Sequence, residues 1–313
     1  MVETILNDYG KRKIPCLFII SFDKSDFYIK PLNEIDSDVL FEIEKSPSSH
    51  HKPISYSFTP PSYKEYKKAF DQVIENIKKG NTYLFNLTFP SKFETTQDLK
   101  TIYQISDAKF KLYFKDKFIC FSPERFVNIK DNKIYTYPMK GTIDAKIKDA
   151  KQKILSNQKE MAEHVMVVDL LRNDLNMVSK KVKVEKFRYI DKIKAGEREL
   201  LQVSSKISGE LEDGWQKRLG SIISTLLPAG SITGTPKKET TRLIKEIESY
   251  DRGFFSGVFG VFDGDSLDSA VMIRFIEKKD NKLYYKSGGG ITIDSDVKSE
   301  YNELQEKVYV PIF

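Results

Sequence analysis

Two short acidic repeats are the first features of the sequence whose residue types and spacing suggest chemistry. Glu160 and Glu163 are three residues apart in QKEMAEH, and Glu300 and Glu303 are three residues apart in SEYNELQEK. Residues at positions i and i+3 of a helix share one face, so each segment is expected to present two carboxylates side by side. Four carboxylates converging on one pocket would suit Mg²⁺, which takes oxygen ligands. For each pair taken alone, a solvated helix face is the alternative.

Glycine and basic residues close to the second pair suggest an anion site. Gly288, Gly289 and Gly290 stand between a predicted strand and that helix, where exposed backbone N–H groups could receive a carboxylate or a phosphate. Arg274 ends the apolar strand DSAVMIRF, and an arginine inside such a run needs a partner. That partner is either a structural acid or a substrate carboxylate. Lys307 follows the second acidic pair and adds a further cation.

A lysine and a glutamate at strand ends could take part in covalent chemistry or proton transfer. Lys140 lies between Pro138 and Gly141 in PMKGT, and a lysine desolvated in a tight turn can lose its proton and act as a nucleophile or base. An ordinary exposed loop lysine is the alternative. Glu124 in SPE stands at a strand end, either as a helix-start carboxylate or as a general acid.

A third charged segment, VVDLLRNDL, favours structure over chemistry. Asp169, Arg172 and Asp174 lie close together in an apolar helical stretch. We expect them to form a buried charge network that holds the helix in position.

Composition excludes several classes of protein. The 313 residues are 40% apolar, and 51 basic against 45 acidic side chains give a net charge of +6. This mild excess is scattered along the chain, whereas nucleic-acid binders concentrate positive charge in a patch. We therefore expect no nucleic-acid partner, with a basic binding module as the alternative class. Three histidines are too few for a histidine-rich metal site, so any metal is expected to have oxygen ligands.

The sequence also predicts a cytoplasmic protein with no membrane partner. The N-terminal segment MVETILNDYGKRK lacks the apolar core of a signal peptide, and the longest apolar run, residues 14–22, is too short to cross a bilayer. Cys16 and Cys120 lie in apolar runs, as expected for buried free thiols in a reducing compartment.

The elements that must position these residues alternate between helices and antiparallel hairpins. Ser62 and Glu65 form a capping box for an amphipathic helix that ends at Gly80. Further helices are expected at 145–175, at 213–226, at 237–249 and after Asp294. Strands are expected in the apolar runs PCLFIISF, FYIKPL, TYLFNLTF, FKLYF, KFICF, RFVNI, KIYTY, FFSGVFGVF, SLDSAVMIRFI and KLYYKS. This alternation predicts an α+β fold. Residues 45–62 are expected to form an exposed connector.

Several segments match a known family when they are taken together. They run in order from about residue 62 to residue 308: IKKGNTYLFNLT, FSPERF, YPMKGT, EMAEHVMVVDLLRNDL, LPAGSITGTPKKETTRLIKEIE, RGFFSGVFGVFDG, VMIR and SGGGITIDSDVKSEYNELQEK. The chain resembles the chorismate-utilising enzymes, and among them most closely the first component of aminodeoxychorismate synthases.

The resemblance implies a fold and a set of site residues. The implied fold is a layered α/β/β/α arrangement, like that of anthranilate synthase component I, with two orthogonally packed antiparallel sheets. Residues 62–313 would form the catalytic domain, and residues 1–61 a short strand region and connector packed on it. The family pattern implies that Mg²⁺ is held by Glu160, Glu163, Glu300 and Glu303. It implies that the substrate is bound by Thr142, Arg274, Gly288, Gly289, Gly290 and Lys307. The implied catalytic residues are Lys140 and Glu124.

The resemblance also implies a reaction, the amination of chorismate at C4 to 4-amino-4-deoxychorismate on the way to p-aminobenzoate and folate. Lys140 matches the lysine that marks the aminodeoxychorismate enzymes. Leu84 stands where relatives that add water have a lysine base, and Gln202 replaces a histidine linked to pyruvate elimination. Ammonia would come from a separate glutaminase subunit. The alternative is anthranilate synthase component I, which converts chorismate to anthranilate and pyruvate.

Overall fold

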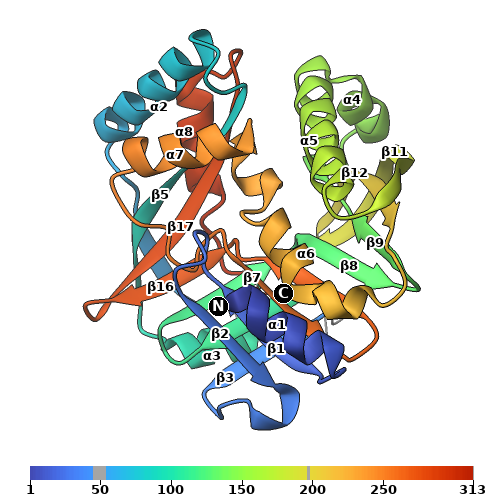
Figure 1. Cartoon of the computed structure of the whole chain (residues 1–313). Helices are drawn as coiled ribbons and strands as arrows, with labels where there is room; N and C mark the ends of the chain where they lie inside the picture. The colour runs from blue at the N-terminus through green and yellow to red at the C-terminus, as the bar shows by residue number, and fades with distance from the viewer. Residues whose placement is uncertain (45–53, 196–197, 313) are drawn as a thin grey trace.

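Helices flank two antiparallel sheets in the computed structural model, which describes residues 1–44, 54–195 and 198–312 (Figure 1). The helices are α1 (Val2–Lys11), α2 (Tyr63–Lys78), α3 (Leu99–Ile105), α4 (Ala150–Ser156), α5 (Gln158–Asn176), α6 (Leu219–Leu226), α7 (Lys237–Ile247) and α8 (Val297–Glu306), with short 3₁₀ turns η1 (Leu32–Glu34), η2 (Trp215–Arg218) and η3 (Gly230–Ile232).

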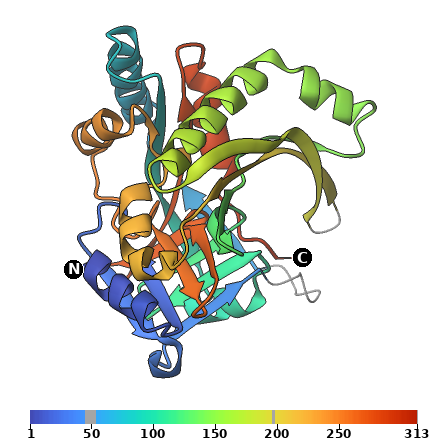
Figure 2. The same ribbon diagram turned by 45° about the vertical axis from the view of Figure 1, so that its right-hand side comes forward.

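The first sheet, here called sheet A, has the strand order β10-β12-β9-β8-β15-β14-β1-β2, with β11 paired to β12. Its strands are β1 (Cys16–Ile20), β2 (Phe27–Pro31), β8 (Arg125–Lys130), β9 (Lys133–Thr136), β10 (Met139–Asp144), β11 (Lys180–Ala195), β12 (Arg198–Glu210), β14 (Val258–Phe262) and β15 (Leu267–Val271). Figure 2 shows the long β11–β12 hairpin running alongside α5, which it contacts.

The second sheet, sheet B, has the order β13-β5-β17-β16-β7-β6-β3, with β4 paired to β5. Its strands are β3 (Val39–Ile43), β4 (Tyr56–Thr59), β5 (Leu84–Thr95), β6 (Phe110–Phe114), β7 (Phe118–Ser122), β13 (Gly234–Thr235), β16 (Phe275–Lys279) and β17 (Lys282–Ile291). Among the described residues, every strand pair in both sheets is antiparallel. The predicted α+β fold with two antiparallel sheets is confirmed.

Strand β1 shows how the layers pack, because both of its faces are buried. Cys16, Phe18 and Ile20 lie in a core cluster that also holds the apolar faces of α1 and α6. Leu17 and Ile19 point to the opposite face, where they pack with residues of β6, β7 and β16 of sheet B. The outer face of sheet B is covered by α3 and the segment 308–312. The order of layers is therefore helix, sheet A, sheet B, helix.

Helix α2 begins and ends as its sequence predicts. The Ser62 side chain accepts a hydrogen bond from the Glu65 N–H, and the Glu65 carboxylate accepts one from the Ser62 N–H, which completes the capping box. The buried face of the helix, centred on Tyr66, Phe70 and Val73, packs in the core with residues of β5 and α8. Helix α2 thereby helps to hold α8 against sheet B.

The N-terminal region differs from its predicted organisation in two places. Helix α1 was not predicted, and β4 pairs with β5 inside the segment expected to be an exposed connector. Residues 45–53 of that connector, including His50 and His51, lie outside the described residues. Strands β1 and β2 belong to sheet A and β3 belongs to sheet B. The proposed domain boundary at residues 61/62 stays a prediction.

The helix expected over 145–175 is two helices, separated at Asn157. The Asn157 side chain accepts a hydrogen bond (3.1 Å) from the Glu160 N–H and so caps α5. The asparagine thereby places Glu160 in the first turn of α5, on the side where the candidate site lies.

The two cysteines are buried free thiols, as predicted. Burial raises the pKa of Cys16 to about 12 and also raises that of Cys120. Across the described ranges, no helix is long and apolar enough to cross a membrane.

Candidate active site

A pocket of about 890 Å³ opens between α5 and α8, which lie on opposite sides of the molecule's upper half in Figure 1. All but one of the predicted site residues line it. They are Glu124, Lys140, Thr142, Glu160, Glu163, Arg274, Gly288, Gly290, Glu300, Glu303 and Lys307. The two acidic pairs therefore face one space from two different helices.

One side of the pocket, here called the α5 rim, consists of Glu160, Glu163 and Lys140. Lys140 lies in β10, and its Nζ is 2.6 Å from Oε2 of the buried Glu163. Helix α5 is held to sheet A by His164, which shares a 2.7 Å hydrogen bond with Ser205 of β12. Burial lowers the pKa of His164 to about 4, so the ring is neutral near pH 7.

The charge of Lys140 depends on two opposing effects, its burial and the neighbouring carboxylates. Burial lowers the pKa of its amine, but the carboxylates of Glu163, Glu303 and Glu160 outweigh this effect and raise the pKa above its usual value. Lys140 lies in strand β10 rather than in the predicted tight turn, and it faces acidic groups. Without a further positive charge, Lys140 is protonated and ion-paired to Glu163.

The opposite side, here called the α8 rim, consists of Glu300, Glu303 and Lys307. Lys307 Nζ lies 2.5 Å from Oε1 of Glu303 and donates a hydrogen bond (2.8 Å) to the carbonyl oxygen of Gly288. Burial lowers the pKa of Lys307, and the charges of Arg274 and Lys140 add to that effect, whereas Glu303 opposes it. Glu300 accepts a hydrogen bond (2.8 Å) from Ser295.

The three glycines form strand rather than the predicted loop. They belong to β17, where Gly288 pairs with Thr88 and Gly290 with Asn86 of β5. The pairing of β17 with β16 stops at Lys286, so within the described chain residues 287–291 have a strand neighbour on one side only. The backbone edge on the other side lines the pocket.

Gly289 does not line the pocket, but its lack of a side chain lets α8 approach. A Cβ there would lie 3.3 Å from Glu300 Oε2, 3.5 Å from Glu303 Oε1 and 3.6 Å from Lys307 Nζ. The glycine therefore brings all three polar groups of the α8 rim close to β17.

Arg274 lies in the break between β15 and β16, with a left-handed φ of 53°. Its guanidinium lies 5.2 Å from the ring centre of Tyr309. The buried Nε has no hydrogen-bond partner, and the charge of Glu124 and a hydrogen bond with Tyr309 favour the protonated guanidinium. A buried donor without a partner, at the wall of a pocket, is expected of a group that binds an external carboxylate.

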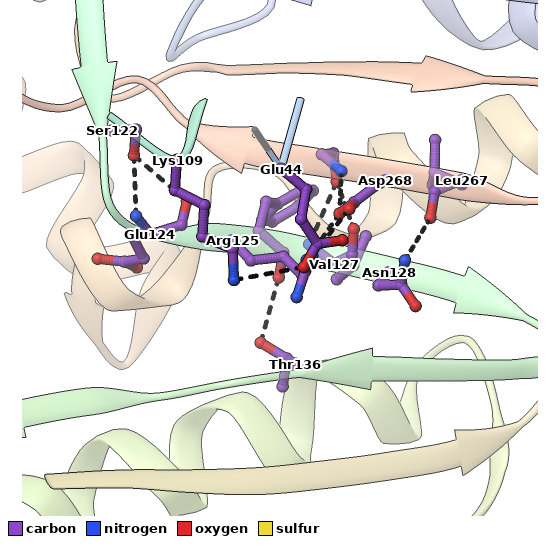
Figure 3. Close-up of polar contacts among 12 residues, drawn as sticks. Glu44, Lys109, Ser122, Glu124, Arg125, Val127, Asn128, Thr136, Leu267 and Asp268 are labelled. Atoms are coloured by element: carbon purple, nitrogen blue, oxygen red, sulfur yellow. Dashed lines mark hydrogen bonds and ion pairs between the residues drawn. The ribbon is translucent and has the colours of Figure 1, made fainter. Parts of the chain in front are cut away.

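Glu124 lies between β7 and β8 and accepts a hydrogen bond from the Ser231 hydroxyl on its Oε1. Burial raises the pKa of Glu124, and the hydrogen bond from Ser231 and the charge of Arg274 partly oppose this. Figure 3 shows its side chain pointing away from that of Arg125, which pairs with Asp268 at 2.7 Å. A raised pKa suits a carboxylic acid that must donate a proton.

The remaining pocket residues set the chemistry near Lys140. Leu84 of β5 supplies an aliphatic wall close to Lys140. A Cβ added to Gly290 would lie 3.2 Å from Leu84 Cδ1 and 3.8 Å from Lys140 Nζ, so the two side chains approach the same point of β17. Thr142 pairs with Gln202 in the β10–β12 ladder, and both line the pocket. Phe255 also lines it.

The four glutamates suit a hard cation by their chemistry, since all their donor atoms are carboxylate oxygens. As they stand, however, no three His, Cys, Asp or Glu side chains of the described chain are grouped closely enough to hold a metal ion. Glu160, Glu163, Glu300 and Glu303 are the residues that would hold Mg²⁺, and this ligand set stays a prediction.

The predicted buried network of the α5 segment is only partly present. Asp169 and Arg172 form an exposed pair (2.7 Å) on the outer face of α5, contrary to the prediction. Asp174 is buried and pairs with Lys237 at 2.7 Å. Asp169 and Arg172 are three residues apart and share the face of α5 that is exposed to solvent. Asp174 lies on another face of the helix, toward Lys237 at the start of α7.

Two residues of the site were missed from sequence. Asn157, which caps α5, precedes an acidic residue by three positions, a recognisable helix-start pattern. Ser231, which contacts Glu124, has no such local signal, because its partner lies 107 residues away.

Comparisons with known proteins agree with this geometry. The family model described as "chorismate binding enzyme" matches residues 18–312. An uncharacterised PabA-like protein of Haemophilus influenzae is 48% identical over 311 residues, which cover 98% of this chain and 95% of that protein. Aminodeoxychorismate synthase component 1 of Bacillus subtilis is 31% identical over 295 residues, covering 89% of this chain and 62% of the relative.

A solved structure has the same fold. The menaquinone-specific isochorismate synthase MenF of Escherichia coli superposes with a TM-score of 0.73 over 97% of this chain and 79% of that chain, at 16% identity.

Proposed function

Because this chain belongs to the family of chorismate binding enzymes, we propose that it replaces the C4 hydroxyl of chorismate with an amino group to give 4-amino-4-deoxychorismate. Lys140, inside the pocket and on the α5 rim, is the observation that carries the proposal. The similarity to aminodeoxychorismate synthase component 1 of Bacillus subtilis supports it. We propose that ammonia comes from a separate glutaminase subunit.

The pocket offers complementary cations for a dicarboxylate. Arg274 has a buried donor without a partner, and Lys307 stands beside the open backbone edge of β17. Charge-assisted hydrogen bonds from these two groups would hold the substrate carboxylates and orient the ring. The ring would then lie between the α8 rim and Lys140.

Covalent catalysis divides the substitution into two displacements. Lys140 Nζ forms a bond to C2 of chorismate, the ring double bonds shift, and the C4–O bond breaks. Glu124 gives a proton to the departing hydroxyl, which leaves as water. Ammonia then bonds to C4, the double bonds shift back, and the C2–N bond to Lys140 breaks. The proton that ammonia loses restores Glu124, so the sum is chorismate plus ammonia giving aminodeoxychorismate plus water.

Lys140 must give up its proton before it attacks. Glu163 Oε2, at 2.6 Å from Nζ, is in place to accept it. When bound, Mg²⁺ would hold a substrate carboxylate and offset the charge of the four glutamates, which favours the neutral form of Lys140.

The surroundings of Lys140 disfavour attack by water. Leu84 has no basic group, so it cannot deprotonate a water molecule at this end of the pocket. A nucleophilic lysine beside an aliphatic wall therefore favours amination over hydration.

Product analysis tests the proposal. The protein is incubated with chorismate, Mg²⁺ and an ammonium salt, and the products are identified by mass spectrometry. A product that contains the new nitrogen and keeps the enolpyruvyl group is expected. Release of pyruvate with anthranilate would identify the alternative reaction, and isochorismate would contradict amination altogether.

A second experiment examines Lys140 itself. Intact-protein mass spectrometry follows incubation with chorismate and Mg²⁺ in the absence of ammonia. An adduct is expected in the wild type that disappears in Lys140→Ala. If no adduct forms and Lys140→Ala aminates chorismate at the wild-type rate, Lys140 is not the nucleophile.

A further inference from the structure

The hydroxyl of Ser231 makes a direct contact with a group that the proposed reaction needs. Ser231 lies in η3 and donates a hydrogen bond to Oε1 of Glu124. Both residues line the large pocket, and both also line a separate cavity of about 20 Å³. Glu124 thus borders two spaces, of which the smaller has room for about one water molecule and none for a substrate.

The turn that carries Ser231 is fixed from the side of β5. The Thr233 hydroxyl donates to the carbonyl oxygen of Ala229 (2.7 Å), and Nη1 of Arg252 donates to that of Ile232 (2.9 Å). Arg252 is buried, forms an ion pair with the buried Glu248 at 2.6 Å and also donates to a carbonyl oxygen of β5. These bonds leave the turn little freedom to move away from Glu124.

The same turn is fixed from the side of α5. Gly230 packs so closely on this helix that a Cβ there would lie 2.9 Å from Asp174 Oδ2. Asp174 in turn pairs with Lys237 at the start of α7. Ser231 therefore stands on a segment that is held from both sides of the pocket, and its position relative to Glu124 is well defined.

A hydroxyl donor on one oxygen determines where a carboxylic acid keeps its proton. In a protonated carboxylic acid, the carbonyl oxygen accepts hydrogen bonds better than the hydroxyl oxygen does. Because Oε1 of Glu124 accepts the hydrogen bond from Ser231, Oε1 is the carbonyl oxygen and Oε2 carries the proton. The bond also opposes rotation of the carboxyl group toward the small cavity, where the proton could not reach a substrate.

We propose that Ser231 is a positioning residue, which holds Oε1 of Glu124 as an acceptor so that the acid donates its proton from Oε2 to the departing hydroxyl. This rests on the proposed function, since it takes Glu124 to be the general acid. Ser231 itself touches no reacting atom in this scheme and acts through Glu124.

The charged groups that face Glu124 set its titration. Arg274, Lys307 and Lys140 all favour its ionised form, as does the hydrogen bond from Ser231, whereas burial favours the neutral acid. Asp174 borders the small cavity. Removal of the Ser231 hydroxyl takes away one contact that favours the carboxylate, so the pKa of Glu124 is expected to rise further.

The test compares Ser231→Ala with Ser231→Thr, which keeps a hydroxyl. In Ser231→Ala, kcat is expected to fall about tenfold or more with KM within about threefold of wild type, and the alkaline limb of the kcat–pH profile should move to higher pH. Ser231→Thr should restore both values. Ser221→Ala serves as the matched control, since that serine also donates to a glutamate (2.7 Å, Glu3) but lies outside the pocket.

A double-mutant cycle separates positioning from general damage. Ser231→Ala is expected to have no further effect on kcat once Glu124→Gln is present. Additive effects, or an unchanged pH profile in Ser231→Ala, would overturn the proposal.

A measurement without turnover distinguishes this inference from the proposed function. The carbon-13 resonance of the Glu124 carboxyl group, assigned through Glu124→Gln, is titrated in the wild type and in Ser231→Ala. An upward shift of the pKa supports the contact even if the product proves to be anthranilate. Equal pKa values in the two proteins would refute the role of Ser231, whatever the reaction is.

Discussion

The α5 rim and the α8 rim of the pocket share the same parts but differ in how those parts are held. Each rim has a pair of glutamates three residues apart and a lysine within 2.6 Å of one of them. On the α8 rim Glu303 lies in α8 and Lys307, four residues later, is the C-cap of the same helix. On the α5 rim Lys140 comes from β10 and meets Glu163 across an interface between a strand and a helix.

The electrostatics of the two rims differ in the same way. Three carboxylates raise the pKa of Lys140, whereas burial and two neighbouring cations lower that of Lys307. The side chain of Glu163 is 5% exposed and that of Glu303 43% exposed. The comparison suggests a division of labour. We propose that the α8 rim, close to Arg274, binds anions and that the α5 rim keeps a lysine whose charge depends on what the carboxylates bind.

Removal of one carboxylate tests whether the two rims bind the same Mg²⁺ ion. Of the substitutions considered, it should have the largest effect on turnover. Glu303→Ala is expected to abolish Mg²⁺-dependent turnover of chorismate, because it takes one ligand from a set of four. Glu163→Ala, on the other rim, should do the same. Activity is measured over a Mg²⁺ titration, with Glu246→Ala on the exposed face of α7 as the control. Undiminished turnover by Glu303→Ala in excess EDTA would show that no shared metal site exists.

Replacement of the two lysines should separate their roles. Lys140→Ala is expected to lower kcat for amination at least about a hundredfold, because the nucleophile is lost, with a slow residual attack by ammonia itself. Lys307→Ala should act mainly on KM. Steady-state kinetics with ammonium distinguish the two patterns, and Lys148→Ala, an exposed lysine near α4, is the control. If both substitutions changed KM equally and left kcat unchanged, the two lysines would not have the different roles assigned to their rims.

Arg274→Ala is expected to have the next largest effect, confined to binding. Loss of one charge-assisted contact costs about 1.5–3 kcal/mol, or roughly 10- to 150-fold in affinity for chorismate. Isothermal titration calorimetry measures this directly, and Arg274→Lys should recover part of it. An affinity within about threefold of wild type would show that this buried arginine has a purely structural role.

The smallest effects are expected from the glycines that let each rim approach its strand. Gly141 has a φ of +86°, and a Cβ there would lie 3.2 Å from Glu160 Oε2, so Gly141→Ala should destabilise the protein by about 1–2 kcal/mol. Gly289 has no such strain, and Gly289→Ala should cost less. Urea unfolding midpoints test the order. The reverse order would mean that the α8 rim is the more tightly packed of the two.

Local patterns in the sequence were sufficient to predict much of the site. The spacing of Glu160 and Glu163 specifies a shared helix face without knowledge of any other segment. The capping pair Ser62 and Glu65 likewise specifies the start of α2, because both partners lie within one turn. Convergence of the two acidic pairs on one pocket is a tertiary property, and it was predicted by the family resemblance.

The failures have a common cause in long-range contacts. Gly288 to Gly290 have low strand propensity, yet pairing with β5, about 200 residues earlier, makes them a strand. Helix α1 has no side-chain cap at its N-terminus and is stabilised by packing against α6 and η2, so its own sequence gives little signal.

The position of β1 in sheet A has a consequence for synthesis on the ribosome. Its two neighbours are β2, which follows within a few residues, and β14, at Val258–Phe262. At roughly 5–20 residues per second, translation supplies the second neighbour only tens of seconds after the first. Throughout that interval the apolar strand CLFII has an unpaired edge and no complete core to enter. The first hairpin is therefore a segment on which chaperones that shield nascent strands would act.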